Sequence, residues 1–236
     1  MNVVYALGGG RGHATRALTL AARLSGPSRV LHQCADPDLP GGIGTPTVAE
    51  LHARLAEALV GATRFVVDTF PGGVAHELGE LPTGVRTVLV ARYVDRSAYP
   101  RYDALAARFD EIWLPYDPDG CEWDDPPDGR YIGPVVRTVP LGPEVDTLVI
   151  GSGEPASWAP LLRDLPRVDG PFASLPRARR VVALSAGYNL GWELATAGIR
   201  TAFRPLPRRF DDQFRRAARL GTPLYHRSCL EGFLAC

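Results

Sequence analysis

The chain has 236 residues, of which 45% are apolar and 22% charged, and its 26 basic and 26 acidic residues give a formal net charge of zero. Such a length predicts one large domain or two small ones, and the composition argues against disorder. The charge balance argues against a nucleic-acid partner and against a polybasic membrane anchor. Every basic residue is arginine and none is lysine, which excludes a P-loop lysine and Schiff-base chemistry.

The sequence contains four cysteines, and no pair has the CxxC spacing typical of a zinc site. The N-terminus lacks a basic leader region, and no apolar run reaches the roughly 18 residues that a membrane span needs. We therefore expect a cytoplasmic protein without a metal centre and without a transmembrane segment.

The first half alternates short apolar runs with amphipathic segments. The runs predict strands at Val3–Leu7, Val30–Cys34, Phe65–Asp68, Thr87–Ala91 and Ile112–Leu114. The segments between them predict helices at Ala14–Leu24, Val48–Leu59, Val74–Leu81 and Asp103–Phe109. Thr47, followed by Glu50 three residues later, is a capping-box signal for the second helix. This alternation predicts a doubly wound parallel sheet.

Residues 117–143 are rich in turn signals, and we place the domain boundary there, giving lobes at 1–137 and 138–236. The second lobe repeats the alternation. Its predicted strands are Thr147–Ile150, Val181–Leu184 and Thr201–Phe203. Its predicted helices are Ala156–Leu165, Asn189–Ala197, Asp211–Leu220 and a short one within Tyr225–Cys236. The expected fold is α/β, with two Rossmann-like lobes and a ligand cleft between them at the carboxyl ends of the strands.

The glycine-rich loop Gly8–His13 joins the first strand to the first helix. Its glycines, including Gly10 and Gly12, would let the backbone approach a ligand, and the helix start offers free N–H groups. A helix N-terminus lowers the pKa of a histidine, so His13 is a candidate general base, with a purely structural role as the alternative. The loop does not match a dinucleotide-binding fingerprint, although Asp36 after the second strand keeps that alternative open.

Two later loops also open helices. Ser185–Asn189 precedes a helix that carries Glu193, and a capping role is the alternative for its polar residues. The proline-stiffened loop Arg204–Gln213 is rich in arginine, which suits bidentate phosphate contacts; a solvated surface loop is the alternative reading. Asp211 or Asp212 is expected to cap the next helix.

These loops resemble a family. Gly8–His13 with its alanine-rich helix is similar to the N-terminal loop of GT-B glycosyltransferases related to the N-acetylglucosaminyltransferase of peptidoglycan synthesis, and Asp68–Pro71 is similar to another loop of that group. The second lobe resembles the donor signature of the same family at Gly187, Asn189, Glu193, Gly198, Pro205 and Asp211–Gln213.

The resemblance implies metal-independent, inverting transfer of a sugar from a nucleotide-diphosphate sugar, most simply a UDP-sugar, to a hydroxyl acceptor. By that resemblance His13 or Asp68 is the catalytic base. The donor would contact residues of three glycine loops (Gly8–His13, Gly151–Gly153 and Ser185–Asn189), of the helix after the third and of the proline loop, namely Gly10, Gly12, Gly153, Ser185, Gly187, Tyr188, Asn189, Glu193, Arg209, Asp212 and Gln213. Arg204 and Arg208 would assist Arg209, and the nucleotide base would lie near Phe172.

Two departures keep other functions open. The second lobe is short, with a strand–helix pair expected to be missing between Leu165 and Ala178, and Ser185 stands where many relatives have histidine. A nucleotide-sugar hydrolase of the same fold, similar to that of pseudaminic acid synthesis, is one alternative. A non-catalytic nucleotide-sugar-binding subunit is the other. A second copy of the chain or a partner subunit is also expected, because another chain can complete a short lobe.

Overall fold

The computed structural model describes residues 1–8, 11–34, 36, 39–138, 141–168 and 175–235. The chain divides into two compact units, unit 1 at Met1–Val136 and unit 2 at Arg137–Cys236. Each unit is an α/β body built on a sheet whose described strand pairs are all parallel. The α/β class and the two Rossmann-like sheets expected from the sequence are confirmed.

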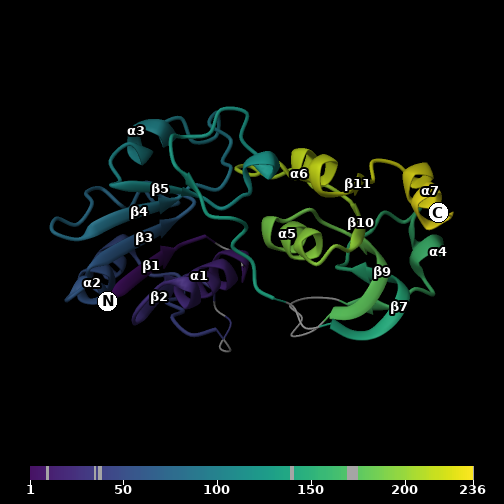
Figure 1. The fold of residues 1–236 in the computed structure, drawn as a ribbon, viewed down its shortest axis with the longest axis horizontal. Coiled ribbons are helices and arrows are strands. Elements are labelled where there is room, and N and C mark those ends of the chain that lie inside the picture. The colour runs from purple at the N-terminus through teal and green to yellow at the C-terminus, as the bar shows by residue number, and fades with distance from the viewer. Residues whose placement is uncertain (9–10, 35, 37–38, 139–140, 169–174, 236) are drawn as a thin grey trace. The chain divides into compact units, whose positions relative to one another are not determined.

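Unit 1 contains a six-stranded sheet in the order β2-β1-β3-β4-β5-β6 (Figure 1). Its strands are β1 (Asn2–Ala6), β2 (Ser28–His32), β3 (Arg64–Asp68), β4 (Arg86–Val90), β5 (Glu111–Leu114) and β6 (Arg130–Tyr131). Its helices are α1 (Arg11–Arg23), α2 (Val48–Leu59), α3 (Tyr102–Ala106) and the short 3₁₀ turn η1 (Pro118–Gly120).

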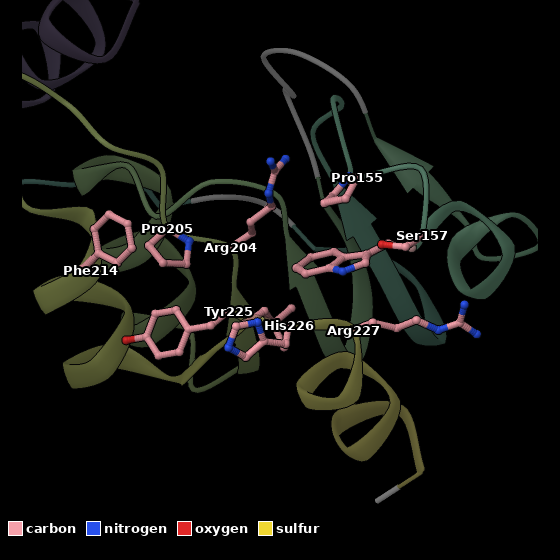
Figure 2. Close-up of a pocket in the computed structure, with 10 residues that line it drawn as sticks. Pro155, Ser157, Arg204, Pro205, Phe214, Tyr225, His226 and Arg227 are labelled. Carbon is pink, nitrogen blue, oxygen red and sulfur yellow. The ribbon is translucent and has the colours of Figure 1, made fainter.

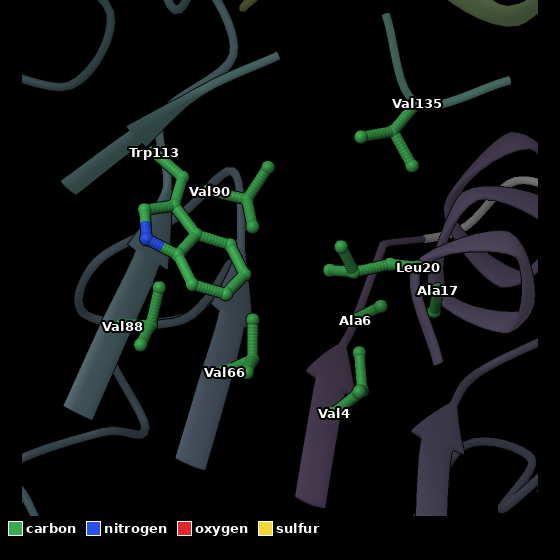
Figure 3. Close-up of a cluster of buried hydrophobic side chains, with 9 residues drawn as sticks. All are labelled: Val4, Ala6, Ala17, Leu20, Val66, Val88, Val90, Trp113 and Val135. Carbon is green, nitrogen blue, oxygen red and sulfur yellow. The ribbon is translucent and has the colours of Figure 1, made fainter. Parts of the chain in front are cut away.

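The core of unit 1 follows from strands that are apolar on both faces. One face packs against α1, with Val4 and Ala6 of β1 against Ala17 and Leu20 of the helix, in a cluster that also holds Trp113 (Figure 3). The side chains that alternate with these, such as Val3 and Tyr5, are also buried. Burial on both faces is the reason that these strands are continuous apolar runs.

Helix α2 begins as its sequence predicts. The Thr47 hydroxyl accepts a hydrogen bond from the Glu50 backbone N–H at 3.2 Å, and the Glu50 carboxylate accepts one from the Thr47 N–H at 2.8 Å. This reciprocal capping box satisfies two backbone donors that a helix start otherwise leaves without partners.

The helix predicted at Val74–Leu81 is wrong, because this segment is a series of turns. The Glu77 side chain turns inward, where its carboxylate accepts hydrogen bonds from the Tyr5 hydroxyl at 2.7 Å and from the Ala75 N–H at 2.8 Å. Gly73 and His76 have φ values of 82° and 60°, which a helix does not contain. The hydrogen bonds of the buried Glu77 carboxylate therefore set the backbone conformation of this segment, although its apolar residues have helical spacing.

Unit 2 contains a five-stranded sheet in the order β11-β10-β9-β7-β8. Its strands are β7 (Leu141–Ile150), β8 (Arg167–Val168), β9 (Leu175–Ala183), β10 (Arg200–Phe203) and β11 (Thr222–Pro223). Its helices are α4 (Ala159–Leu162), α5 (Tyr188–Thr196), α6 (Gln213–Leu220) and α7 (Arg227–Ala235). Numbered within the unit, the order is 2-1-3-4-5, the same as in the first five strands of unit 1.

Both faces of this sheet are also covered. Leu148, Val181 and Phe203 pack with α5 and α6 on one face. Their sequence neighbours Val149 and Val182 pack with α4 and α7 on the other. The alternation of neighbouring residues between two cores is the period-2 signature of a strand with two buried faces.

Two details of unit 2 differ from expectation. A strand predicted to be missing after Leu165 is present as the short β8, which pairs with Val149 and Ile150 of β7. Helix α4 has only four residues instead of ten, because prolines at 155, 160 and 166 limit helix growth. Phe172 lies outside the described residues.

Candidate functional site

The site in unit 1 lies where the strand order changes direction. From β1 the chain continues to β2 on one side of β1 and later returns to β3 on the other side. In open α/β sheets, ligands bind outside the carboxyl ends of the strands at such a point. The segments that leave β1 and β3 here carry the two predicted catalytic residues, His13 and Asp68.

The structure brings these two residues together with a third. His13 Nδ1 lies 2.8 Å from Asp68 Oδ2. Arg16 binds the same carboxylate with two groups, its Nε donating to Oδ1 at 2.7 Å and its Nη2 to Oδ2 at 2.5 Å. His13 and Arg16 are three residues apart in α1, so they share one face of the helix.

The carboxylate at the centre of this group is buried. Asp68 and Arg16 are each 2% exposed. Burial alone would raise the pKa of Asp68, but the Arg16 guanidinium and the hydrogen bonds from His13 and Arg16 hold that pKa well below its usual range. Asp68 is therefore ionised at neutral pH and accepts hydrogen bonds only.

The ionised carboxylate decides which nitrogen of His13 carries the proton. Arg16 Nη2 also lies 3.2 Å from His13 Nδ1, but Asp68 cannot donate, so its shorter contact of 2.8 Å with the same nitrogen requires a proton on Nδ1. Burial and the Arg16 charge lower the pKa of His13, although Asp68 acts in the opposite direction. The ring is therefore neutral at pH 7 and its Nε2 lone pair can accept a proton. The pKa of His13 is thus lowered mainly by burial, whereas the helix N-terminus was the cause expected from the sequence.

The backbone around the imidazole is shaped to fit it. A Cβ atom on Gly8 would lie 2.6 Å from the His13 ring, so only glycine allows this packing. The Phe70 ring stacks on the imidazole, with its centroid 5.9 Å from that of His13. Thr69, which is fully buried, has a φ of 71° and accepts a hydrogen bond from Arg16 Nη2 at 3.1 Å. Backbone strain of this kind clusters at functional sites.

Two glycines of the loop after β1 were also predicted to contact the donor. Gly10 lies outside the described residues, and Gly12 is exposed in the first turn of α1. Arg11 forms an ion pair with Asp36, the residue that had kept dinucleotide binding open.

In unit 2 the corresponding change of direction lies between β7 and β9. The predicted loops that contain Gly153, Ser185 and Gly187 leave the sheet at the carboxyl ends of these two strands. Gly187 is the N-cap of α5 and provides no side-chain cap, and Tyr188 and Asn189 form the first turn. Gly153 has a φ of 80° and its carbonyl accepts a hydrogen bond from Arg204.

Gln213 links two of these loops. Its buried Oε1 accepts hydrogen bonds from the Ala186 N–H at 2.9 Å and from the Leu206 N–H at 3.0 Å. Asp212 caps α6 by accepting from the Arg215 N–H at 2.9 Å, which confirms one of the two capping residues expected. In this structure both side chains therefore shape the loops from within.

Glu193 is buried in α5, where its Oε1 accepts a hydrogen bond from Arg137 Nε at 3.0 Å. Burial raises the pKa of Glu193, and Arg137 counteracts part of that rise. Arg209 is exposed, with its guanidinium 4.8 Å from the centre of the Phe210 ring.

Sequence reasoning missed two buried arginines. Arg16 completes the group in unit 1, and Arg216 is fully buried in unit 2, where it pairs with Asp211 at 2.6 Å and donates to the Ala186 carbonyl at 2.7 Å. The available signal was their position among alanines on the inner face of a helix, next to Ala17 and Ala217. An arginine at such a position is buried only with a partner.

The described residues contain no group of three or more His, Cys, Asp or Glu side chains placed to hold a metal ion. None of the helices in the described part of the chain has both the length and the apolar character needed to cross a membrane.

Comparisons with family models, with curated proteins and with solved structures found no match to this chain.

The partly buried histidine makes the stability of the protein depend on pH. Below pH 6.5 the unfolded chain takes up a proton at His13 while the folded protein, with its lowered pKa, does not. The free energy of unfolding should then decrease as the pH falls below 6.5, by at most about 1.4 kcal/mol per pH unit from this group.

Urea unfolding followed by circular dichroism between pH 5 and 8 tests this. His13→Gln keeps a donor for Asp68 but removes the titrating group, so its free energy of unfolding should depend less on pH between 6.5 and 5 than that of the unmodified protein. Equal slopes for the two proteins would contradict a lowered pKa at His13.

Proposed function

We propose that the protein is a GT-B-like glycosyltransferase in which His13 is the general base. The observation that carries the proposal is the contact of His13 Nδ1 with the ionised Asp68, which directs the Nε2 lone pair to proton abstraction. In the reaction, Nε2 takes the proton of an acceptor hydroxyl as its oxygen attacks the anomeric carbon of a nucleotide-diphosphate sugar. The bond from that carbon to the diphosphate breaks, and the diphosphate leaves with the electron pair.

Three features support this assignment. The base has its pKa below 6.5 and so is unprotonated at pH 7, as a general base must be. Asp68 orients the ring and stabilises the imidazolium that forms, as carboxylates do in His–Asp pairs. The loops of unit 2 at Gly151–Gly153 and Gly187–Asn189 present backbone at the carboxyl ends of parallel strands, a place suited to a diphosphate.

The same base can deprotonate a water molecule, which would make the protein a nucleotide-sugar hydrolase. The two functions differ in one observable property, the release of free nucleotide in the absence of an acceptor. A panel of nucleotide sugars, incubated with the purified protein with and without hydroxyl acceptors, separates them. Transfer predicts release that depends on the acceptor, whereas hydrolysis predicts release in water alone. Failure to bind any nucleotide sugar or diphosphate would overturn both.

His13→Gln should lower turnover roughly 100- to 10,000-fold, the usual contribution of a general base, with donor affinity largely retained. Turnover is measured by nucleotide release and donor affinity by calorimetry. His52→Gln is the matched control and should leave turnover unchanged, because the side chain of His52 is on α2, where Nε2 lies 2.7 Å from the Glu77 carbonyl and glutamine can donate the same hydrogen bond. Normal turnover in His13→Gln would remove His13 from the mechanism.

Arg16 acts through its neighbours and is a positioning residue. Its charge lowers the pKa of both His13 and Asp68. In Arg16→Met both pKa values should therefore rise, and the acidic limb of the kcat/KM profile should move to higher pH. Arg16→Lys, which keeps the charge, should return the limb toward its original position. A loss of activity in Arg16→Met with no displacement of the limb would show a merely structural role.

A further inference from the structure

A pocket in unit 2 is lined by none of the residues expected to contact the donor directly, although it includes Pro205 and Arg204, the latter expected to assist Arg209. It has a volume of about 530 Å³ and is formed by the segments that follow β7, β10 and β11, together with the first turn of α6. The carboxyl ends of parallel strands are where α/β proteins bind ligands, and the volume is in the range of small-molecule sites.

Two aromatic rings form one wall of the pocket. Phe214 of α6 and Tyr225 after β11 stack with ring centroids 6.2 Å apart and an interplanar angle of 13°. They are 44% and 50% exposed, and no other aromatic side chain of the described residues stands out as exposed to this degree. Figure 2 shows both rings on the same side of the pocket. A stacked pair left open to water provides a surface on which another flat ring can pack.

The charge at the rim is positive. Arg204 donates to the Gly153 carbonyl, and its guanidinium lies 5.9 Å from the centre of the Trp158 ring. This bond uses one of the five N–H donors of arginine, which leaves others to meet an anion. No carboxylate is among the residues that line the pocket.

The other nearby charges are compensated. Arg227 forms an ion pair with Glu231 at 2.7 Å, and its guanidinium points away from the aromatic rings (Figure 2). Glu154, in the loop after β7, is held by two hydrogen bonds from Arg167 at 2.7 and 3.0 Å. We therefore expect Arg204 to be the side chain that binds an anion in this pocket.

We propose that this pocket is a second binding site, which takes a small ligand with a flat aromatic ring and a phosphate group. The ring packs against Phe214 and Tyr225, and the phosphate accepts hydrogen bonds from Arg204. Aryl phosphates and nucleoside monophosphates share this chemistry. The proposal is independent of the reaction assigned to His13.

Binding is measured by calorimetry and ligand-observed NMR on the full chain, with phenyl phosphate and uridine monophosphate as probes. Ribose 5-phosphate, which lacks the ring, and phenol, which lacks the anion, complete the set. Phenyl phosphate should bind at least tenfold more tightly than either of these. Uridine monophosphate binding that is tighter than that of phenyl phosphate, and that Phe214→Ser weakens while Glu193→Gln does not, identifies the nucleotide as the ligand of this pocket; weaker binding than phenyl phosphate identifies an aryl phosphate.

Arg204→Gln should weaken phenyl phosphate binding about tenfold or more, the effect expected for losing a charge-assisted hydrogen bond. Phe214→Ser and Tyr225→Ser, which change exposed rings on separate segments, should each weaken it as well, with folding checked by circular dichroism. Arg163→Gln, an exposed arginine of the same unit outside the pocket, is the control and should bind normally. His13→Gln should also bind normally, so that a failure here is distinguishable from a failure of the proposed reaction.

Three results would overturn the proposal. One is that phenyl phosphate binds no more tightly than ribose 5-phosphate. The second is that the Arg204 and aromatic variants bind as well as Arg163→Gln. The third is that sedimentation shows a dimer that Phe214→Ser dissociates while phenyl phosphate does not bind, because the exposed rings would then be a contact between two copies of the chain.

Discussion

The organisation of unit 1 depends on a buried carboxylate at the end of β3. Asp68 is charged in an interior that disfavours charge, and it is compensated by Arg16 and His13 of α1. Removing one partner of a buried ion pair typically costs about 3–5 kcal/mol. The requirement for compensation therefore ties the helix that follows β1 to the end of the neighbouring strand. It also fixes the orientation of the imidazole at the place where such sheets bind ligands.

The same constraint gives the histidine its chemistry. A partly buried imidazole with a charged arginine close by favours its neutral form, and an ionised carboxylate at Nδ1 selects one tautomer. Gly8 provides the space for the ring, and Thr69 accepts a bond from Arg16 in an unfavourable backbone conformation. Packing alone does not explain a histidine with these supporting residues. An apolar side chain would fill the same space with a smaller loss of folding free energy, because it needs no buried charged partner.

Much of the fold could be read from the sequence, because apolar runs such as Val3–Leu7 are long enough to mark strands that are buried on both faces. The capping box at Thr47 and Glu50 was equally local and equally readable. The segment around Glu77 was misread because its path is set by a bond to Tyr5, which lies 72 residues away. Strands β7 and β9 begin earlier than predicted. Their first halves, Leu141–Asp146 and Leu175–Arg180, contain charged residues and proline, so they lack the apolar run that marks a strand in the sequence.

The candidate site was predicted only in part for a similar reason. His13 and Asp68 stood out by residue type and by their place after strands. Arg16 and Arg216 did not, because an arginine in a helix normally faces water and only the tertiary structure provides the partner that allows burial. In unit 2 the polar side chains of Gln213 and Asp212 are engaged with the backbone of their own loops. A one-dimensional motif does not distinguish a residue that shapes a loop from one that touches a ligand.

The role of His13 as a general base depends on its protonation state, and nitrogen-15 NMR of the imidazole measures that state directly. A long-range proton–nitrogen spectrum of the full chain at pH 7.5, with the His13 signals assigned by their loss in His13→Gln, reports which ring nitrogen carries the proton. We expect a neutral ring with the proton on Nδ1 and a bare Nε2. A proton on Nε2, with Nδ1 bare or also protonated, would contradict it.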